Sequence, residues 1–326
     1  MINLEHGGDL DRAIAHYGGR KQDWIDLSTG INPTSYPVAE IAPNLLRDLP
    51  DQGLVNATKQ AARKAYNTSL ACIPLAGAQQ AIQLFPSIVK KSTDNASIYS
   101  PSYNEHEIQL RKAGWQVKYC TSIEEMRNAD CAVVVNPNNP DGKQFSPDVL
   151  LDLANDVGTL IIDESFCDLY PNLSILPHLN DKHHNIIILR SLGKFYGLAG
   201  IRLGFVFAHQ EVINEFAKAA GNWAVSGPAL AIGTTALTDT NWRQQMRENL
   251  TKDALRLDAL TSPNYLHLVG GTDLFRLYHC DNAQNMQDRL AQHQIWSRIF
   301  SYAPNWIRLG LPPQHGWQRL EKLFKL

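Results

Sequence analysis

Short β-rich runs alternate with helical stretches through the middle of this sequence, and this alternation most constrains the fold. Stretches 104–114 and 146–158 have helical periodicity, and they separate runs rich in Val, Ile and aromatic residues. The expected strands span residues 96–100, 115–120, 131–137, 158–163, 185–191 and 202–208. Continuous Val and Ile runs are typical of strands buried on both faces, as in parallel sheets covered by helices. The sequence therefore predicts an α/β fold with a mostly parallel sheet.

The pattern changes near residue 240. One long amphipathic helix is expected over 241–261, with strand candidates at 265–271, 273–279 and 306–311. This tail predicts a small α+β domain beside the larger one. The predicted division is an N-terminal segment 1–45 that joins the small domain, a large domain 46–238, and a small C-terminal domain 239–326.

Charge and cysteine usage exclude several classes of function. A net charge of −2 over 326 residues gives no electrostatic reason to expect nucleic acid or an anionic membrane as partner. No apolar run is long enough to span a membrane, and no signal peptide is evident. The five cysteines are scattered and never spaced as CxxC. We therefore expect a cytoplasmic protein with reduced thiols and no metal site.

Polar residues follow two of the expected buried strands, where open α/β sheets bind their ligands. Two prolines in "NPNNPDG" shape the backbone around Asn139, which could point into a cleft. A plain surface turn is the alternative, because Asn, Pro, Asp and Gly are common turn residues. Asp163 and Glu164 end the run "TLIIDES", where a buried carboxylate needs a partner. Alternatively, these acids are solvated or cap a helix.

Two further stretches suit an anionic group. Gly77 and Ala78 precede a helical stretch whose N-terminal N–H groups could bind an anion, although small residues precede many helices. In "RSLGKFYGLAGIRLGF", Ser191 and Arg202 suit a phosphate, and Lys194 between them could do covalent chemistry. Each signal is weak alone, but together they occur in a specific order.

That ordered set resembles the fold-type I pyridoxal 5'-phosphate (PLP) enzymes of the aspartate aminotransferase superfamily, over nearly the whole chain. The resemblance implies that Lys194 forms the Schiff base with PLP and that Asp163 keeps the pyridine nitrogen protonated. The other implied contacts are Asn139 to the phenolic oxygen, Tyr103 stacked on the ring, Ala78, Gln79, Ser191 and Arg202 around the phosphate, and Arg308 on the substrate α-carboxylate.

Finer signals are similar to one branch of that superfamily. "EHGGDLDRAIAHYGG", "WIDLSTGINP", "NWAVSGPAL" and "GGTDLFRL" resemble the threonine-phosphate decarboxylases of cobalamin biosynthesis, relatives of histidinol-phosphate aminotransferase. The resemblance implies conversion of L-threonine O-3-phosphate to (R)-1-amino-2-propanol phosphate and CO2, by a homodimer. Phe166 departs from the wider pattern, which often has tyrosine there as a donor to the phenolic oxygen. This departure puts standard transamination in doubt.

The substrate phosphate needs its own ligands, because its binding energy could fix which bond at the α-carbon breaks. We expect His6, Thr29 and Arg276 to bind it, with Asn32 at the entrance. His6 could instead be a solvated N-terminal residue, and Arg276 could lie on the water-facing side of a strand. Trp223 could help close the pocket or belong to the core.

Three rival functions remain open at this stage. An aminotransferase for histidinol phosphate or a related amino acid would share every cofactor residue. A non-catalytic PLP-fold partner protein is disfavoured by the intact Lys194, Asp163 and Arg202. A nucleotide-binding α/β protein is disfavoured because the first βα turn has no GxGxxG and the sequence has no GxxxxGK[ST].

Overall fold

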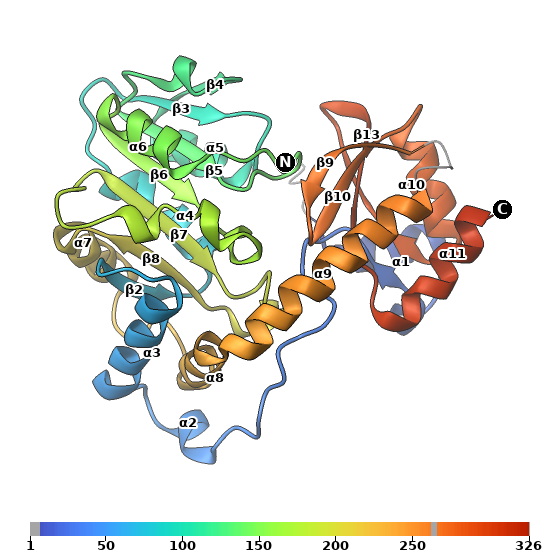
Figure 1. Ribbon diagram of the computed structural model, residues 1–326, viewed down its shortest axis with the longest axis horizontal. Helices are drawn as coiled ribbons and strands as arrows, with labels where there is room; N and C mark the ends of the chain where they lie inside the picture. Colours follow the sequence, from blue (N-terminus) through green and yellow to red (C-terminus); the bar gives the residue numbers. More distant parts are fainter. Residues whose placement is uncertain (1–6, 262–265, 326) are drawn as a thin grey trace. The chain divides into compact units, whose positions relative to one another are not determined.

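The computed structural model describes residues 7–261 and 266–325, which form two compact units (Figure 1). The large unit is Tyr36–Arg243, and the small unit comprises the described parts of Met1–Ser35 and Gln244–Leu326. The N-terminal segment therefore belongs with the C-terminal part of the chain. The division into domains at 45/46 and 238/239 stays a prediction.

The large unit contains a seven-stranded sheet in the order β2-β8-β7-β6-β5-β3-β4. Strand β8 runs antiparallel to both neighbours, and the other pairs are parallel. The strands are β2 (Ala71–Leu75), β3 (Asn95–Tyr99), β4 (Gln116–Cys120), β5 (Cys131–Val135), β6 (Thr159–Asp163), β7 (Ile186–Ser191) and β8 (Gly204–Ala208). Strands β5 and β7 are buried at every residue, as their continuous Val and Ile runs predicted. The predicted α/β class is confirmed.

Helices surround this sheet, and side-chain caps set where several of them begin. Asp51 accepts a hydrogen bond from Leu54 N at 2.7 Å at the start of α3, and Ser146 and Ser226 cap α6 and α8 in the same way. Phe85 of α4 and Phe216 of α7 pack on Val133 and Ile161 in one core cluster. The helices are α2 (Pro43–Arg47), α3 (Gln52–Ala65), α4 (Ala78–Ile88), α5 (Glu105–Lys112), α6 (Pro147–Asn155), α7 (Gln210–Ala220) and α8 (Gly227–Thr238).

The small unit contains a four-stranded antiparallel sheet in the order β12-β13-β10-β9. A separate parallel pair joins β1 to β11, which brings the N-terminal segment onto the C-terminal part. The strands are β1 (Ile25–Asp26), β9 (His267–Thr272), β10 (Phe275–His279), β11 (Ile295–Trp296), β12 (Arg298–Phe300) and β13 (Ala303–Gly310). The helices are α1 (Leu10–Tyr17), α9 (Thr240–Thr261), α10 (Ala283–Gln292) and α11 (Trp317–Lys325), with the unit boundary inside α9.

The described residues include no helix that is both long enough and apolar enough to cross a membrane. This agrees with the absence of a long apolar run in the sequence.

Candidate active site

The topology of the large sheet brings the predicted cofactor residues to one edge. Strands β5, β6 and β7 are parallel neighbours, so their carboxyl ends lie side by side. Asn139 follows β5, Asp163 ends β6, and Ser191 ends β7. This edge is where an open α/β sheet binds its ligand.

Asp163 is a buried carboxylate that is held by contacts from two residues, His106 and Ser165. Nε2 of His106 lies 3.0 Å from its Oδ2, while the amide and hydroxyl of Ser165 donate to Oδ1 at 3.0 and 2.5 Å. Burial alone would raise the pKa of Asp163, but the hydrogen bonds and charge of His106 and Ser165 outweigh burial and lower that pKa. The side chain is therefore an anion inside the protein, suited to pair with a cationic group.

The start of α4 and Arg202 form a cradle for an anion. The first N–H groups of a helix have no partner within the helix, so those of Ala78 and Gln79 face outwards from its end. The guanidinium of Arg202 lies against Gly77, where a Cβ atom would be 2.6 Å from Nη2. Arg202 itself has a left-handed backbone with φ 54°, and its Nη1 donates to Ala199 O at 3.1 Å. The predicted phosphate ligands Ala78, Gln79 and Arg202 thus lie together.

Strand β8 packs closely against the start of α4, next to this cradle. A Cβ atom on Gly204 would lie 2.5 Å from Ala78 N and 2.7 Å from Arg190 O. Only a glycine allows the strand to approach the first residue of α4 so closely. Ser191 pairs with Gly204 in the sheet, so its buried side chain stands next to the same helix start.

Lys194 lies three residues beyond the end of β7 and is half-buried. Its Nζ is 5.7 Å from the centre of the Phe166 ring, and Phe166 itself is buried. The amide of Gly193 donates to Ser191 Oγ at 3.3 Å and tightens the turn that precedes the lysine. At position 166, where the superfamily that the sequence resembles often has a tyrosine, this chain therefore has an apolar ring near Lys194.

Tyr103 and Asn139 lie in loops that follow β3 and β5. Tyr103 donates its hydroxyl to Gln79 Oε1 at 3.2 Å, which ties the loop after β3 to the start of α4. The Asn136 amide donates to Phe145 O at 3.0 Å, and Asn138 accepts from Ser102 Oγ at 2.8 Å. These two side chains hold the part of the loop that leads into the half-buried Asn139.

Arg308 is a buried cation in the small unit. Its Nη2 donates to Ser28 O at 2.7 Å, and its guanidinium carbon lies 4.9 Å from the centre of the Phe275 ring. The half-buried Thr29 follows Ser28 directly. Gly8 N donates to Ser28 Oγ at 2.7 Å, so the N-terminal segment passes beside the same loop. His6 lies outside the described residues.

Asn32 is buried, and its Oδ1 accepts a hydrogen bond from Thr34 N at 2.8 Å. The side chain therefore shapes the turn that follows Thr29.

Trp223 is 61% exposed and has φ 54°, so it is not the core residue that the alternative interpretation proposed.

Arg276 does not join Arg308 in the small unit. Its guanidinium binds Asp258 of α9 with two hydrogen bonds, at 3.0 and 2.7 Å. The register pairs Arg308 with Leu277, so Arg276 points to the opposite face of the sheet. We therefore leave Arg276 out of the candidate substrate site.

Two residues that the sequence did not point to lie next to predicted site residues: Arg298 beside Arg308, and His106 beside Asp163. Arg298 pairs with Arg308 across β12 and β13, so both side chains share one face. Arg298 and Ser28 also line one cavity of about 350 Å³. His106 contacts Asp163 although 57 residues separate them in the sequence. Its place three residues after Tyr103 was the available signal.

Comparisons with known proteins give the family. A family model described as aminotransferase class I and II matches residues 23–325. The chain is 38% identical to a threonine-phosphate decarboxylase from a Sinorhizobium species over 322 residues, which cover 97% of this chain and 96% of that relative. It is 36% identical to a threonine-phosphate decarboxylase from Pseudomonas aeruginosa, with 98% of this chain and 96% of that relative covered.

A solved structure has the same fold. It is histidinol-phosphate aminotransferase from Sinorhizobium meliloti in complex with pyridoxal-5'-phosphate, with a TM-score of 0.82 and 18% identity. The match covers 99% of this chain and 96% of that one. At this identity the likeness concerns the fold alone, whereas the family model and the two closer relatives extend over nearly the whole chain. The chain therefore belongs to the aminotransferase class I and II family.

Proposed function

We propose that this protein is a PLP-dependent decarboxylase that converts L-threonine O-3-phosphate to (R)-1-amino-2-propanol phosphate and CO2. The observation that carries the proposal is the identity of 38% and 36% to two threonine-phosphate decarboxylases over nearly the whole chain. The retained lysine, aspartate and arginine in the large unit support it, because they are the groups that PLP chemistry needs.

The residues of the large unit fit PLP. The cofactor carries a phosphate, a basic ring nitrogen and an aldehyde, and these need an anion cradle, an anionic partner and an amine. The start of α4 with Arg202 and Ser191 supplies the cradle, and buried Asp163 supplies the anion. Lys194 supplies the amine from the turn after β7. When bound, PLP draws electrons from the bonds at the substrate α-carbon.

In this proposal the chain's own groups bind and orient the reactants. The Asp163 carboxylate holds a proton on the ring nitrogen, because its lowered pKa keeps it anionic. Tyr103 and Asn139 contact the ring and its phenolic oxygen. Lys194 holds the cofactor before substrate binds, and its amine is then placed to carry a proton. The apolar ring of Phe166 donates no hydrogen bond to the phenolic oxygen.

The small unit supplies the substrate contacts of the proposal. Arg308 binds the α-carboxylate, and Thr29, Asn32 and His6 contribute to the place for the phosphate. Arg298 replaces Arg276 as the second cation. Arg298 and Arg308 are register partners, so the two cations share one face of the sheet and suit a substrate with a carboxylate and a phosphate.

We further propose that the protein acts in cobalamin biosynthesis, as a homodimer in the cytoplasm. The role in cobalamin biosynthesis is supported by the likeness to the two decarboxylases. The cytoplasmic location is supported by the five buried cysteines, none of which is in a disulfide bond.

The test is turnover of L-threonine O-3-phosphate by the PLP-loaded protein without any 2-oxo acid. The proposal predicts release of CO2 in a 1:1 ratio with the amino alcohol phosphate. A strict requirement for 2-oxoglutarate, with formation of glutamate and no CO2, would identify an aminotransferase instead. The Lys194→Ala variant serves as the control for uncatalysed loss of CO2.

A further inference from the structure

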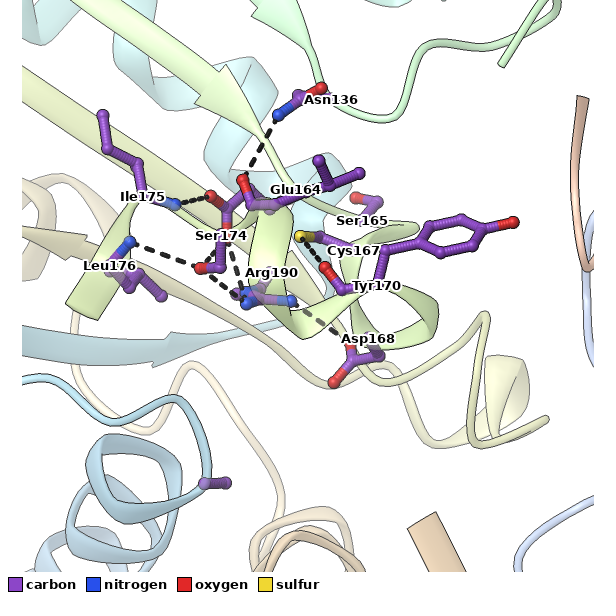
Figure 2. A network of polar contacts seen from close by, with 12 residues as sticks. Asn136, Glu164, Ser165, Cys167, Asp168, Tyr170, Ser174, Ile175, Leu176 and Arg190 are labelled. Atoms are coloured by element: carbon purple, nitrogen blue, oxygen red, sulfur yellow. Dashed lines mark hydrogen bonds and ion pairs between the residues drawn. The ribbon is translucent and has the colours of Figure 1, made fainter. Parts of the chain in front are cut away.

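A buried polar network lies directly behind the strand ends that carry the proposed cofactor contacts (Figure 2). Arg190, next to Ser191 in the chain, points its guanidinium at Glu164, next to Asp163. Its Nη2 lies 3.0 Å from Glu164 Oε2, and the two residues are 2% and 0% exposed. The mechanism above uses neither residue.

Strand geometry explains why neighbouring residues at these strand ends have different contacts. Asp163 and Leu189 are register partners, so their side chains share a face of the sheet with Ser191, two residues further along. Glu164 and Arg190 point to the opposite face. Glu164 N also donates to Leu189 O at 2.9 Å, which extends the pairing of the strands by one residue. One face thus presents the cofactor contacts, and the other carries an ion pair between the same two strand ends.

The network saturates the Glu164 carboxylate and fixes its direction. Ser174 Oγ donates to Oε2 at 2.7 Å, and Ile175 N donates to Oε1 at 2.9 Å. Ser174 Oγ also accepts from Arg190 Nη2 at 3.0 Å. Figure 2 shows Ser174, Ile175 and Arg190 gathered around the Glu164 carboxylate. A carboxylate held by several donors has one orientation, so the backbone that carries it is held as well.

A second carboxylate and an aromatic ring hold the other sides of the guanidinium. Asp168 Oδ2 lies 3.6 Å from Arg190 Nη1, and the ring centre of Tyr66 lies 4.1 Å from the guanidinium carbon. Asp168 belongs to neither strand and lies in the short turn Cys167–Leu169. Buried ion pairs contribute little net stability compared with apolar packing, because desolvation offsets the attraction. This network is therefore better suited to fixing geometry than to stabilising the fold.

We infer that the Arg190–Glu164 ion pair is a positioning device that locks the ends of β6 and β7 together, and so sets the separation between Asp163 and Ser191. In the proposed function, Asp163 contacts the ring nitrogen of PLP and Ser191 contacts its phosphate. These two groups lie at opposite ends of the cofactor. The inference rests on the cofactor contacts proposed above and is independent of the substrate. Loss of the pair shifts both contacts at once, although neither Arg190 nor Glu164 touches the cofactor.

The test compares four variants of the full chain: Arg190→Met, Glu164→Gln, the double variant, and the matched control Asp168→Asn. The control removes a carboxylate from the same guanidinium without breaking the link between strand ends. The double variant leaves neither Arg190 nor Glu164 as a buried charge without its partner, so we expect it to be more stable than the single variants. Asp168 loses the same cation in the double variant as in Arg190→Met. Circular dichroism and thermal unfolding of the cofactor-free proteins check folding.

PLP binding is then measured by titration, with the visible band of bound PLP reporting its ring end and the 31P resonance reporting its phosphate end. We expect the dissociation constant for PLP to rise about tenfold in the folded double variant, the scale typical of residues that orient ligand-binding groups. Both spectroscopic signals shift together in that variant, and neither shifts in Asp168→Asn.

Unchanged PLP affinity and spectra in the folded double variant would overturn the inference, as would equal shifts in Asp168→Asn, which would point to a general packing effect. A wild-type protein that takes up no PLP would instead refute the proposed function. The two failures are therefore distinguishable.

Discussion

Asp163 and His106 form the most informative pair at the scale of single residues. The imidazole is fully buried, and its Nε2 faces a carboxylate that can only accept, so this nitrogen carries the proton. With Ser165 on the other oxygen, the carboxylate keeps its charge in a site where burial alone would neutralise it. His106 thus links helix α5 to the cofactor site.

This pair predicts an acid-dependent contribution to stability. The folded-state pKa of Asp163 lies below its unfolded value, so its stabilisation is present above the unfolded pKa of about 3.9 and is lost as the pH falls through the folded pKa. We expect cofactor-free Asp163→Asn to be about 2 kcal/mol less stable than wild type at neutral pH, as for a buried hydrogen bond to a charged group.

Urea unfolding of both proteins across the acid range measures this difference. The difference in unfolding free energy between wild type and the variant should become smaller as the pH falls below the unfolded-state pKa of Asp163. Wild type then loses the charge that the variant lacks. A gap that stays constant down to the lowest pH at which both proteins fold would contradict the lowered pKa.

At the scale of elements, the contact between β8 and the start of α4 shapes the anion cradle. The strand and the helix approach each other at Gly204 and Ala78, and Arg202 crosses the opening beside Gly77. Neither the helix end nor the arginine alone makes a specific site. The close approach of the strand brings Ser191, the helix start and the guanidinium to one point.

A methyl group at Gly204 tests this contact. Gly204→Ala places Cβ 2.5 Å from Ala78 N and 2.7 Å from Arg190 O, both backbone atoms that cannot move away alone. We expect a loss of about 1–3 kcal/mol in unfolding free energy, as for overpacking, together with weaker PLP binding.

Gly200→Ala is the matched control, because a Cβ there meets nothing within 4 Å although it lies only four residues away. Urea unfolding and PLP titration of the two variants give the comparison. Equal affinity for PLP in both would show that the cradle does not depend on the approach of β8 to α4.

At the scale of the whole molecule, the sequence predicted the parts that depend on local pattern. The expected strands became β3 to β8, and the polar residues that follow β5, β6 and β7 lie at one edge, because parallel neighbours in a sheet end together. The pairing of β1 with β11 was beyond reach, because it joins residues 270 positions apart, as in Ile25 with Ile295. No local pattern encodes so distant a partner.

The place of Arg276 could not be read from the sequence for a related reason. Alternation along a strand shows that neighbouring side chains point to opposite faces, but not which face meets the ligand. The register decides this, since it sets Arg298 opposite Arg308 and turns Arg276 towards Asp258. Cofactor residues at strand ends were easier to predict, because topology alone brings them together.

In the proposed function, Lys194 in the turn after β7 holds PLP at this edge of the large sheet. Borohydride reduces the carbon–nitrogen double bond between PLP and a lysine to a stable linkage, which peptide mass spectrometry then locates. For the reduced holoenzyme we predict that the pyridoxyl phosphate group is found on the peptide that contains Lys194. A label on another of the chain's lysines, or no label on a protein that binds PLP, would contradict the account.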